Sequence, residues 1–368
     1  TKGIGLGIAI EFAREGAKLV IGGRNEETGA EGVKALHAAG HNVHLLCYTR
    51  SGQPLNEEMN GVAVSRVTIS PLRYKMKALA LLLPFYFNFW EKHISRQLQN
   101  EHYDALHFHD LTLAKVCLRA GQKVKVPVIG DYHENRPEIM KYYHHVRSFP
   151  GKVLISVRGW QKYQMVHTPH LDHLILVTPE AKDYYSRHYG VPAEKITVVE
   201  NFPDLKELMQ FDADDALIKK YSSRKMLLYF GDTGLRRGTA TILEAAERMK
   251  NDPEYCFVIV GDSREQQKLL EMKQTKKLDN VELTGYLPLE KALSYFRAAH
   301  AGLSPLLGNI HHDTTYANKI FQYMAFGLPV VVSNCMAQAS VVRESACGFV
   351  HQAGNAADLV QKIKLLDN

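Results

Sequence analysis

The chain has 368 residues, of which 45% are hydrophobic and 23% are charged, and its formal net charge is +6. This composition excludes a disordered chain, and the length exceeds one ordinary hydrophobic core, so we expect two domains. The positive charge is mild and unclustered, which argues against nucleic-acid binding and leaves a solvated surface, an anionic substrate or a membrane surface open. The five cysteines lack Cys-x-x-Cys spacing, so they indicate neither a disulfide framework nor a zinc site and favour a cytosolic compartment.

Apolar strands alternate with helical stretches along the whole chain, which is the pattern of a parallel sheet covered on both faces. In the first half the predicted strands are residues 17–22, 42–48, 62–67, 105–109, 126–132, 173–177 and 196–199. In the second half they are residues 226–230, 257–260, 281–283, 301–303 and 330–333. Pro203 and an acidic run interrupt the pattern, so we place a hinge at about residues 201–205 and predict domains at residues 1–200 and 201–368.

The chain begins inside a glycine-rich turn. Residues 1–32, with Gly3 and Gly5, resemble the cofactor turn of short-chain dehydrogenases, where glycines let the backbone approach a pyrophosphate. The strand that should precede this turn is missing, and the one Tyr-x-x-x-Lys pair, Tyr221 and Lys225, comes far later, just before a predicted buried strand. We therefore interpret residues 1–32 as a foreign segment whose strand 17–22 joins the following domain.

Residues 78–90 form the longest apolar run, but it has thirteen residues and contains a proline. A membrane-spanning helix needs about 20 residues, so this run is not predicted to span a bilayer. A basic, aromatic patch of this kind could lie on an anionic leaflet, and a core helix of the first domain is an equally open interpretation. Basic residues flank the run, namely Arg73, Lys75, Lys77, Lys92 and Arg96.

Polar residues collect where two predicted strands of the first half end, and ligands gather at the carboxyl ends of strands in open α/β sheets. His107 and His109 are two residues apart, so on a strand they point to one face. Imidazole and carboxylate groups suit zinc, iron or manganese, but no spacing of the His-Glu-x-x-His kind supports a metal here, and we predict none. The polar residues are His107, His109, Asp110, His133 and Glu134, with His144 and His145 further along.

The segment 226–249 predicts a strand, a glycine turn and a helix that begins near Thr239. A helix amino terminus carries about half a positive charge, and its free N–H groups can hold a diphosphate. Arg236 and Arg237 add fixed cations at this turn. Upstream, Asp212 and Asp214 form an Asp-x-Asp pattern that leads into a helix, which indicates a helix cap and not a manganese site.

Residues 316–333, YANKIFQYMAFGLPVVVS, predict a helix with an apolar face that stops at Gly327 and a buried strand that Pro329 opens. This sequence motif resembles the nucleotide-sugar-binding helix of retaining family-4 glycosyltransferases with the GT-B fold, and the resemblance extends over about residues 34–368. It implies an α/β protein of two Rossmann-like parallel-sheet domains that face a cleft, an acceptor domain followed by a nucleotide-sugar domain. By the same comparison the chain looks truncated at both ends.

The resemblance also implies roles for individual residues. Arg237 matches a basic residue that contacts the donor diphosphate, and His133 matches a histidine that contacts the donor sugar, so both are predicted to be catalytic. Asp232 stands where the family has a second arginine, whose contact is lost or supplied by Arg236. Thr314 and Gln322 replace two family glutamates, the second of which binds the ribose. The expected donor-binding residues are Gly231, Arg236, Lys319, Gln322, Asn201 and His109.

The predicted function is therefore that of a retaining, metal-independent glycosyltransferase of the hexosyltransferase type, without a cofactor. It would move a sugar from a nucleotide-diphosphate sugar to a carbohydrate or lipid-linked acceptor in surface polysaccharide or glycolipid synthesis. The expected place is the cytoplasm, at the inner face of the plasma membrane, with no nucleic-acid partner. Two alternatives stay open: an NAD(P)-dependent, short-chain dehydrogenase-like oxidoreductase, and an inactive nucleotide-binding scaffold.

Overall fold

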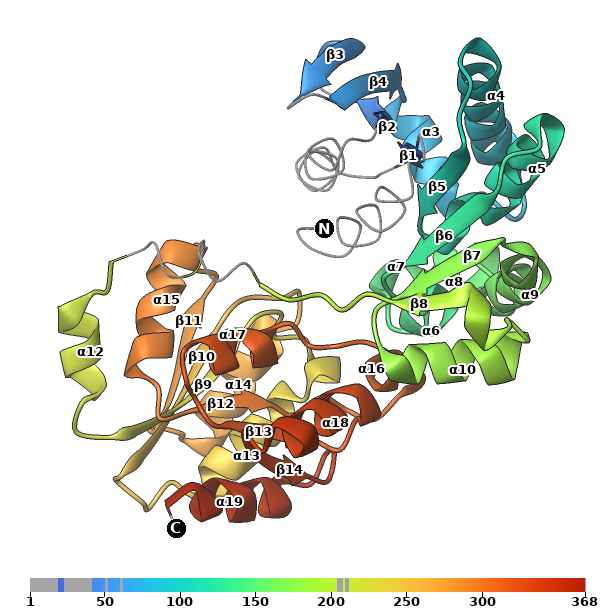
Figure 1. The fold of residues 1–368 in the computed structure, drawn as a ribbon. Helices are drawn as coiled ribbons and strands as arrows, with labels where there is room; N and C mark the ends of the chain where they lie inside the picture. The colour runs from blue at the N-terminus through green and yellow to red at the C-terminus, as the bar shows by residue number, and fades with distance from the viewer. Residues whose placement is uncertain are drawn as a thin grey trace. The chain divides into compact units, whose positions relative to one another are not determined.

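The computed structural model describes residues 19–22, 42–49, 52–59, 62–203, 208 and 212–367. The described residues up to Asn201 form one compact unit, and those from Phe202 onward form a second. Each unit is built on one twisted sheet with helices packed against it (Figure 1).

The sheet of the first unit has the strand order β3-β4-β2-β1-β5-β6-β7-β8. All neighbours are parallel except β3, which runs antiparallel to β4 at the edge. The strands are β1 (Leu19–Gly22), β2 (Val43–Thr49), β3 (Asn56–Met59), β4 (Val62–Thr68), β5 (Ala105–His109), β6 (Val128–Tyr132), β7 (His173–Leu176) and β8 (Ile196–Val198).

The helices of the first unit include short turns between longer elements. The α-helices are α3 (Pro71–Lys75), α4 (Phe85–Asn100), α5 (Ala114–Val124), α6 (Arg136–Met140), α7 (His144–Arg147), α8 (Gly151–Leu154), α9 (Val157–His167) and α10 (Pro179–Tyr189). The 3-10 turns are η1 (Met76–Leu79), η2 (Leu111–Leu113), η3 (Thr168–His170) and η4 (Ala193–Lys195).

The aromatic run of the first half becomes helix α4, which lies beside α5 (Figure 1). Tyr86, Phe87 and Trp90 are buried in the main core of the unit, so the core-helix interpretation is correct for these residues. Leu82 and Phe85, just before and at the start of α4, remain exposed. No helix in the described ranges has the length and apolar character needed to cross a membrane.

The sheet of the second unit has the order β11-β10-β9-β12-β13-β14, and its strands pair in parallel. The strands are β9 (Lys225–Phe230), β10 (Tyr255–Val260), β11 (Val281–Gly285), β12 (Ala301–Ser304), β13 (Val330–Ser333) and β14 (Gly348–His351). The helices are α12 (Asp215–Tyr221), α13 (Thr239–Arg248), α14 (Gln266–Lys276), α15 (Leu289–Ala298), α16 (Ile310–Asp313), α17 (Lys319–Ala325), α18 (Met336–Ser345) and α19 (Ala356–Lys364), with 3-10 turns η5 (Leu235–Arg237) and η6 (Leu365–Asp367).

Helices cover both faces of the second sheet. Side chains alternate along a strand, and on β9 Leu227 and Tyr229 belong to one apolar cluster while Met226 and Leu228 belong to another. A parallel sheet buried on both faces therefore explains why its strands are continuous apolar runs in the sequence.

Each predicted strand is confirmed, with ends that shift by at most two residues, and residues 105–109 and 330–333 match β5 and β13 at both ends. The strand expected in the amino-terminal segment is confirmed as β1, which pairs in parallel with β2 and β5. Two strands were not predicted: β3 is a polar edge strand, and β14 is a short edge strand that begins with a glycine. Asp214 caps α12 by accepting the Leu217 N–H, as expected.

We predict that Tyr323→Phe destabilises the second unit. The buried Tyr323 hydroxyl accepts the Phe230 N–H at 2.9 Å and donates to the Leu303 carbonyl at 3.3 Å. Phenylalanine would leave both backbone groups without this partner, at a cost of about 1–3 kcal/mol. Urea denaturation followed by circular dichroism should show a lower midpoint. Tyr286→Phe, on an exposed side chain, is the matched control, and equal midpoints for the two variants would refute the role of this hydroxyl.

Candidate functional site

Three histidines surround one carboxylate at the carboxyl ends of β5 and β6. The two strands are parallel neighbours, and their register places His109 opposite Asp131. Oδ2 of Asp131 lies 2.8 Å from Nδ1 of His109, 3.2 Å from Nε2 of His133 and 3.6 Å from Nε2 of His107. Asp131 is fully buried, whereas His109 and His133 keep some exposure. We call these four residues the histidine–aspartate cluster.

Within the cluster, the pKa values of His109 and His133 shift in opposite directions. Burial alone would raise the pKa of Asp131, but the charges and hydrogen bonds of the surrounding imidazoles lower that pKa well below its usual value. Burial lowers the pKa of His109, although Asp131 opposes the change. For His133 burial acts in the same direction, yet the adjacent Asp131 outweighs it and raises the pKa. Of His109 and His133, it is therefore His133 that holds a positive charge more readily.

Asp131 is not among the residues that the sequence predicts for this site. It lies two residues before His133, the same spacing that links His107 to His109, so strand periodicity could have placed it with the histidines. Two neighbouring candidates are not side-chain members of the cluster: Glu134 lies 3.6 Å from Arg136, and Asp110 contacts Asp131 through its backbone, because its N–H donates to the Asp131 carbonyl.

One part of the cluster has the spacing of a metal site. The ligand atoms of His107, His109 and Asp131 lie within 4.8 Å of one another, and among the described residues no other such group is found. His133, which lies 3.2 Å from the same carboxylate, also offsets its charge without an ion. His144 and His145 do not join this group. The absence of a metal therefore stays a prediction of the sequence.

Three cationic side chains of the second unit lie near the turn that follows strand β9. Gly231 follows the strand with φ at 118°, and the chain then turns through Asp232 to the two arginines of η5. Oδ2 of Asp232 lies 2.8 Å from the Arg236 guanidinium and 3.5 Å from Nε of Arg237. Lys319 reaches the same place from the start of α17. We call Gly231, Asp232, Arg236, Arg237 and Lys319 the cationic cradle.

Lys319 is the least compensated charge of the cradle. Its Nζ lies 3.4 Å from the centre of the Tyr229 ring, it is buried, and it has no hydrogen-bond partner among the described residues. A side chain added at Gly231 would approach this Nζ to 3.6 Å, so the glycine leaves the ammonium group open toward the turn. Burial lowers the pKa of Lys319 well below its usual value, and the charges of Arg237 and Arg236 add to the effect while Asp232 opposes it.

Helix α13 begins directly after the arginines, at Thr239, which is where the sequence placed it. Gly238 precedes it with φ at 79°, and a Cβ on this residue would lie 1.7 Å from the Pro305 carbonyl oxygen. Only glycine fits this close approach. No side chain caps the helix, so its amino-terminal N–H groups keep their partial positive charge next to the cradle.

The positive charges of the cradle also act on two buried histidines of α16. Burial lowers the pKa of His311 to about 3 and that of His312 to about 4, and Arg237 and Arg236 contribute in both cases. Nδ1 of His312 donates to the Leu307 carbonyl at 2.7 Å. Sequence reasoning did not single out these histidines, because nothing in the pattern His-His-Asp indicates burial beside arginines. Both are neutral near pH 7.

The remaining candidates are spread over the two units. Gln322 lies half-buried on α17, one turn after Lys319, and Thr314 donates to the Ile310 carbonyl within its own turn. Asn201 is the last residue of the first unit. The Tyr221 hydroxyl donates to Glu282 and Lys225 pairs with Asp367, so these two residues do not form a dehydrogenase pair. The glycine turn of residues 1–7 lies outside the described residues.

Comparison with known families identifies both units. Residues 30–207 match Glycosyltransferase Family 4, and residues 224–368 match Glycosyl transferases group 1. The chain is built from two glycosyltransferase domains of the GT-B type. The first match begins close to residue 34, where the resemblance in the sequence was expected to begin.

Several known proteins are similar to this chain in sequence or in structure. A stretch of 109 residues is 33% identical to WcaI of Escherichia coli (strain K12), which is named as a colanic acid biosynthesis glycosyl transferase; the match takes in 27% of this chain and 25% of that protein. The sucrose-phosphate synthase (tll1590) from Thermosynechococcus elongatus has a TM-score of 0.70 at 18% identity, over 95% of this chain and 89% of that one. Anabaena Alr3699/HepE in complex with UDP and glucose has a TM-score of 0.64 at 16% identity, over 96% and 90%. The structural likenesses establish the GT-B fold alone.

We predict that Asp131→Asn lowers the pKa of His133, because the carboxylate is what holds its charge. A unit charge at this distance shifts a pKa by about 1–3 pH units. NMR titration of the imidazole Cε1 protons measures this directly. Because the pKa of folded His133 is raised, its charge stabilises the fold below the unfolded pKa of about 6.5 and this contribution is lost as the pH rises through the folded pKa. Asp183→Asn, an exposed carboxylate, is the control; a His133 titration identical in both variants would contradict the assignment.

Proposed function

We propose that the protein transfers a sugar from a nucleotide-diphosphate sugar to an acceptor hydroxyl. The observation that carries this proposal is the cationic cradle, in which Asp232 pairs with Arg236 and Arg237 while Lys319 has no hydrogen-bond partner among the described residues. A lysine buried without a hydrogen-bonded partner tends to lose its proton, as the lowered pKa of Lys319 indicates, and a bound anion would favour its charged form. A diphosphate supplies negative charge and acceptor oxygens to the cations and to the start of α13.

Catalysis on this proposal is mainly electrostatic. As the bond between sugar and diphosphate breaks, negative charge grows on the leaving phosphate, and cations fixed beforehand stabilise it without reorganisation. Asp232 holds the arginines in place before the donor binds, and the diphosphate then takes over part of that contact. The side chains supply the charge that a metal ion supplies in other transferases, which is why we propose a metal-independent reaction without a cofactor.

His133 is the proposed contact to the donor sugar. With its Nε2 beside Asp131, the imidazolium presents Nδ1–H as a donor to a sugar hydroxyl. Asp131 is fully buried, so it is poorly placed to attack the sugar, and no second carboxylate belongs to the cluster. Attack from the face that the diphosphate leaves, with retention of configuration, is the mechanism that fits these residues. His109 would line the same place.

The donor and the acceptor are proposed by analogy. Similar structures contain UDP or UDP-glucose, and the partly aligned WcaI is named for colanic acid biosynthesis. We propose a nucleotide-sugar donor bound by the cradle, with Gln322 and Asn201 near its ribose and sugar, and a surface polysaccharide or glycolipid as the product. Exposed Leu72, Leu82 and Phe85 beside basic residues suit contact with an anionic leaflet on the cytoplasmic side.

A binding scaffold without turnover is the second candidate. Asp232 replaces a cation at the diphosphate and Gln322 replaces a carboxylate at the ribose, and a neutral hydrogen bond is about half as strong as a charge-assisted one. This candidate and the transferase both bind nucleotide. Only the transferase produces free nucleotide diphosphate in the presence of an acceptor.

We expect Arg237→Ala to reduce turnover by about 10²–10³-fold, the usual loss for a group that stabilises transition-state charge. Release of nucleotide diphosphate from a panel of UDP- and GDP-sugars measures turnover, and a melting curve measures folding. Arg248→Ala removes the same charge from the exposed carboxyl-terminal end of α13, the helix that follows Arg237, and should change neither. Full turnover in Arg237→Ala would remove the cradle from the mechanism, and tighter binding of NADPH than of UDP or GDP would favour the dehydrogenase alternative.

His133→Ala should affect a different step. Loss of the sugar contact is expected to lower kcat by about 10²-fold while leaving the Kd for UDP or GDP nearly unchanged, since the cradle is intact. Turnover assays and calorimetric titration separate the two effects. His188→Ala, an exposed histidine on α10, serves as the control. A variant that loses nucleotide affinity in proportion to turnover would show that His133 is not a sugar contact.

A further inference from the structure

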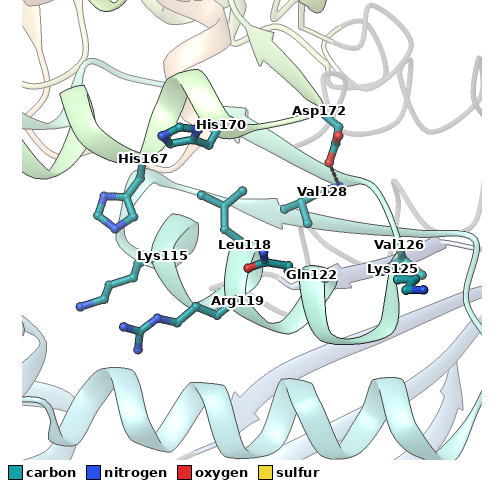
Figure 2. Close-up of a pocket in the computed structure, with 11 residues that line it drawn as sticks. Lys115, Leu118, Arg119, Gln122, Lys125, Val126, Val128, His167, His170 and Asp172 are labelled. Atoms are coloured by element: carbon teal, nitrogen blue, oxygen red, sulfur yellow. Dashed lines mark hydrogen bonds between the residues drawn. The ribbon is translucent and has the colours of Figure 1, made fainter.

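A pocket of about 600 Å³ opens in the first unit between α5 and η3 (Figure 2). Val128 begins β6 and Asp172 directly precedes β7, so the pocket lies at the amino ends of these strands. His109 and His133 lie at the carboxyl ends of β5 and β6, on the opposite edge of the sheet. The pocket is therefore separate from the histidine–aspartate cluster, and the proposed sugar transfer does not use it.

The charged and titratable lining of the pocket is basic except for one acidic side chain. Oδ2 of that acid, Asp172, accepts the Val128 N–H at 2.8 Å, so the carboxylate is engaged by the backbone (Figure 2). Lys115, Arg119 and His167 lie together at one end of the pocket in Figure 2, with Leu118 beside them. The basic lining residues are Lys115, Arg119, Lys125, His167 and His170.

An aromatic stack fixes the basic end. The His167 ring stacks on Tyr163 at 4.3 Å, and its Nδ1 donates to the Tyr163 carbonyl at 2.8 Å, which leaves Nε2 for another partner. Phe87 stacks on Tyr163 at 5.8 Å, and the Lys115 ammonium group lies 5.8 Å from the Phe87 ring centre. The Tyr163 hydroxyl also accepts a hydrogen bond from the backbone N–H of Lys115 at 2.9 Å. The position of the imidazole is thus set before any ligand binds.

These charges are poorly compensated within the protein. Lys115 and Arg119 are four residues apart on α5, a spacing at which like charges repel, and the first turn of this helix has no acidic residue. Arg119 lies 3.6 Å from Glu91, which is closer to Lys123 at 3.1 Å. No ion pair is found for Lys115 or Lys125 within the described part of the chain. Burial lowers the pKa of His167, and Lys115, His170 and Arg119 lower it further against the Tyr163 carbonyl.

We propose that this pocket binds the phosphate groups of a phosphorylated ligand, held by Lys115, Arg119 and His167. Phosphate oxygens would accept hydrogen bonds from the guanidinium and ammonium groups. Nε2 of His167 would become a further donor once the bound anion favours protonation of the imidazole, against the lowered pKa of the empty pocket. The bound anion would relieve the repulsion along α5. A volume of about 600 Å³ accommodates a small ligand larger than a single phosphate.

Inorganic pyrophosphate is the probe, titrated by calorimetry into the full chain carrying Arg237→Ala, which weakens the cradle as a competing site. One binding event is expected. Lys115→Gln with Arg119→Gln should weaken it at least about tenfold, because two charge-assisted contacts are lost. Gln122→Glu puts a carboxylate into the pocket on an exposed, nearly isosteric side chain, so it should weaken binding in the same way without a risk to folding.

Lys123→Gln is the matched control, since it removes a charge from the same helix outside the pocket and should leave pyrophosphate binding unchanged. Vesicles of phosphatidylcholine with phosphatidic acid distinguish the source of the phosphate: co-sedimentation that Gln122→Glu abolishes assigns a lipid headgroup, and pyrophosphate binding alone assigns a free ligand. Absence of pyrophosphate binding, or binding that survives both pocket variants, overturns the proposal.

Discussion

The uncompensated ammonium group of Lys319 is the constraint on which the second unit depends. A lysine taken from water into a protein must find a counter-charge or a hydrogen-bond acceptor, or else it tends to release its proton. Lys319 has a tyrosine ring in place of both, which agrees with its lowered pKa, and a bound anion would favour its charged form. The strand glycine, the turn and the uncapped helix leave room beside it. Each of these features costs stability in the empty protein, and an anion would compensate all of them together. Such local loss of folding stability is typical of a binding site.

Asp232 gives this site a property of its own. It replaces a cation that the resemblance would place next to the diphosphate, and it holds both neighbouring arginines in the empty protein. Burial would raise its pKa, but the Gly234 N–H and the two arginines lower that pKa below its usual value, so the carboxylate is ionised near pH 7. A donor must therefore compete with Asp232 for the same guanidinium groups. This arrangement orders the two arginines before the donor binds, and it also lowers the affinity for the donor.

The first unit shows the opposite arrangement. There the buried charge is negative, and three imidazoles compensate Asp131. Because histidine changes its charge near neutral pH, the carboxylate can keep one imidazole protonated while burial keeps another neutral. His107 and Asp131 are buried on strands, so the two more exposed rings present the chemistry of the cluster. A fixed carboxylate that orients histidines is a device for placing a proton at a chosen atom.

The sequence by itself determined the alternation of strands and helices, because strands buried on both faces must be apolar runs and helices must end at residues such as Gly327. It also determined the cationic turn after β9 and the start of α13, since glycine spacing and adjacent arginines are local features. Only the tertiary structure decided that Lys319 is buried over Tyr229, that Asp131 lies among the histidines, and that β3 and β14 complete the sheets. Burial of one side chain and pairing of an edge strand depend on neighbours far away in the chain, and no local pattern contains that information.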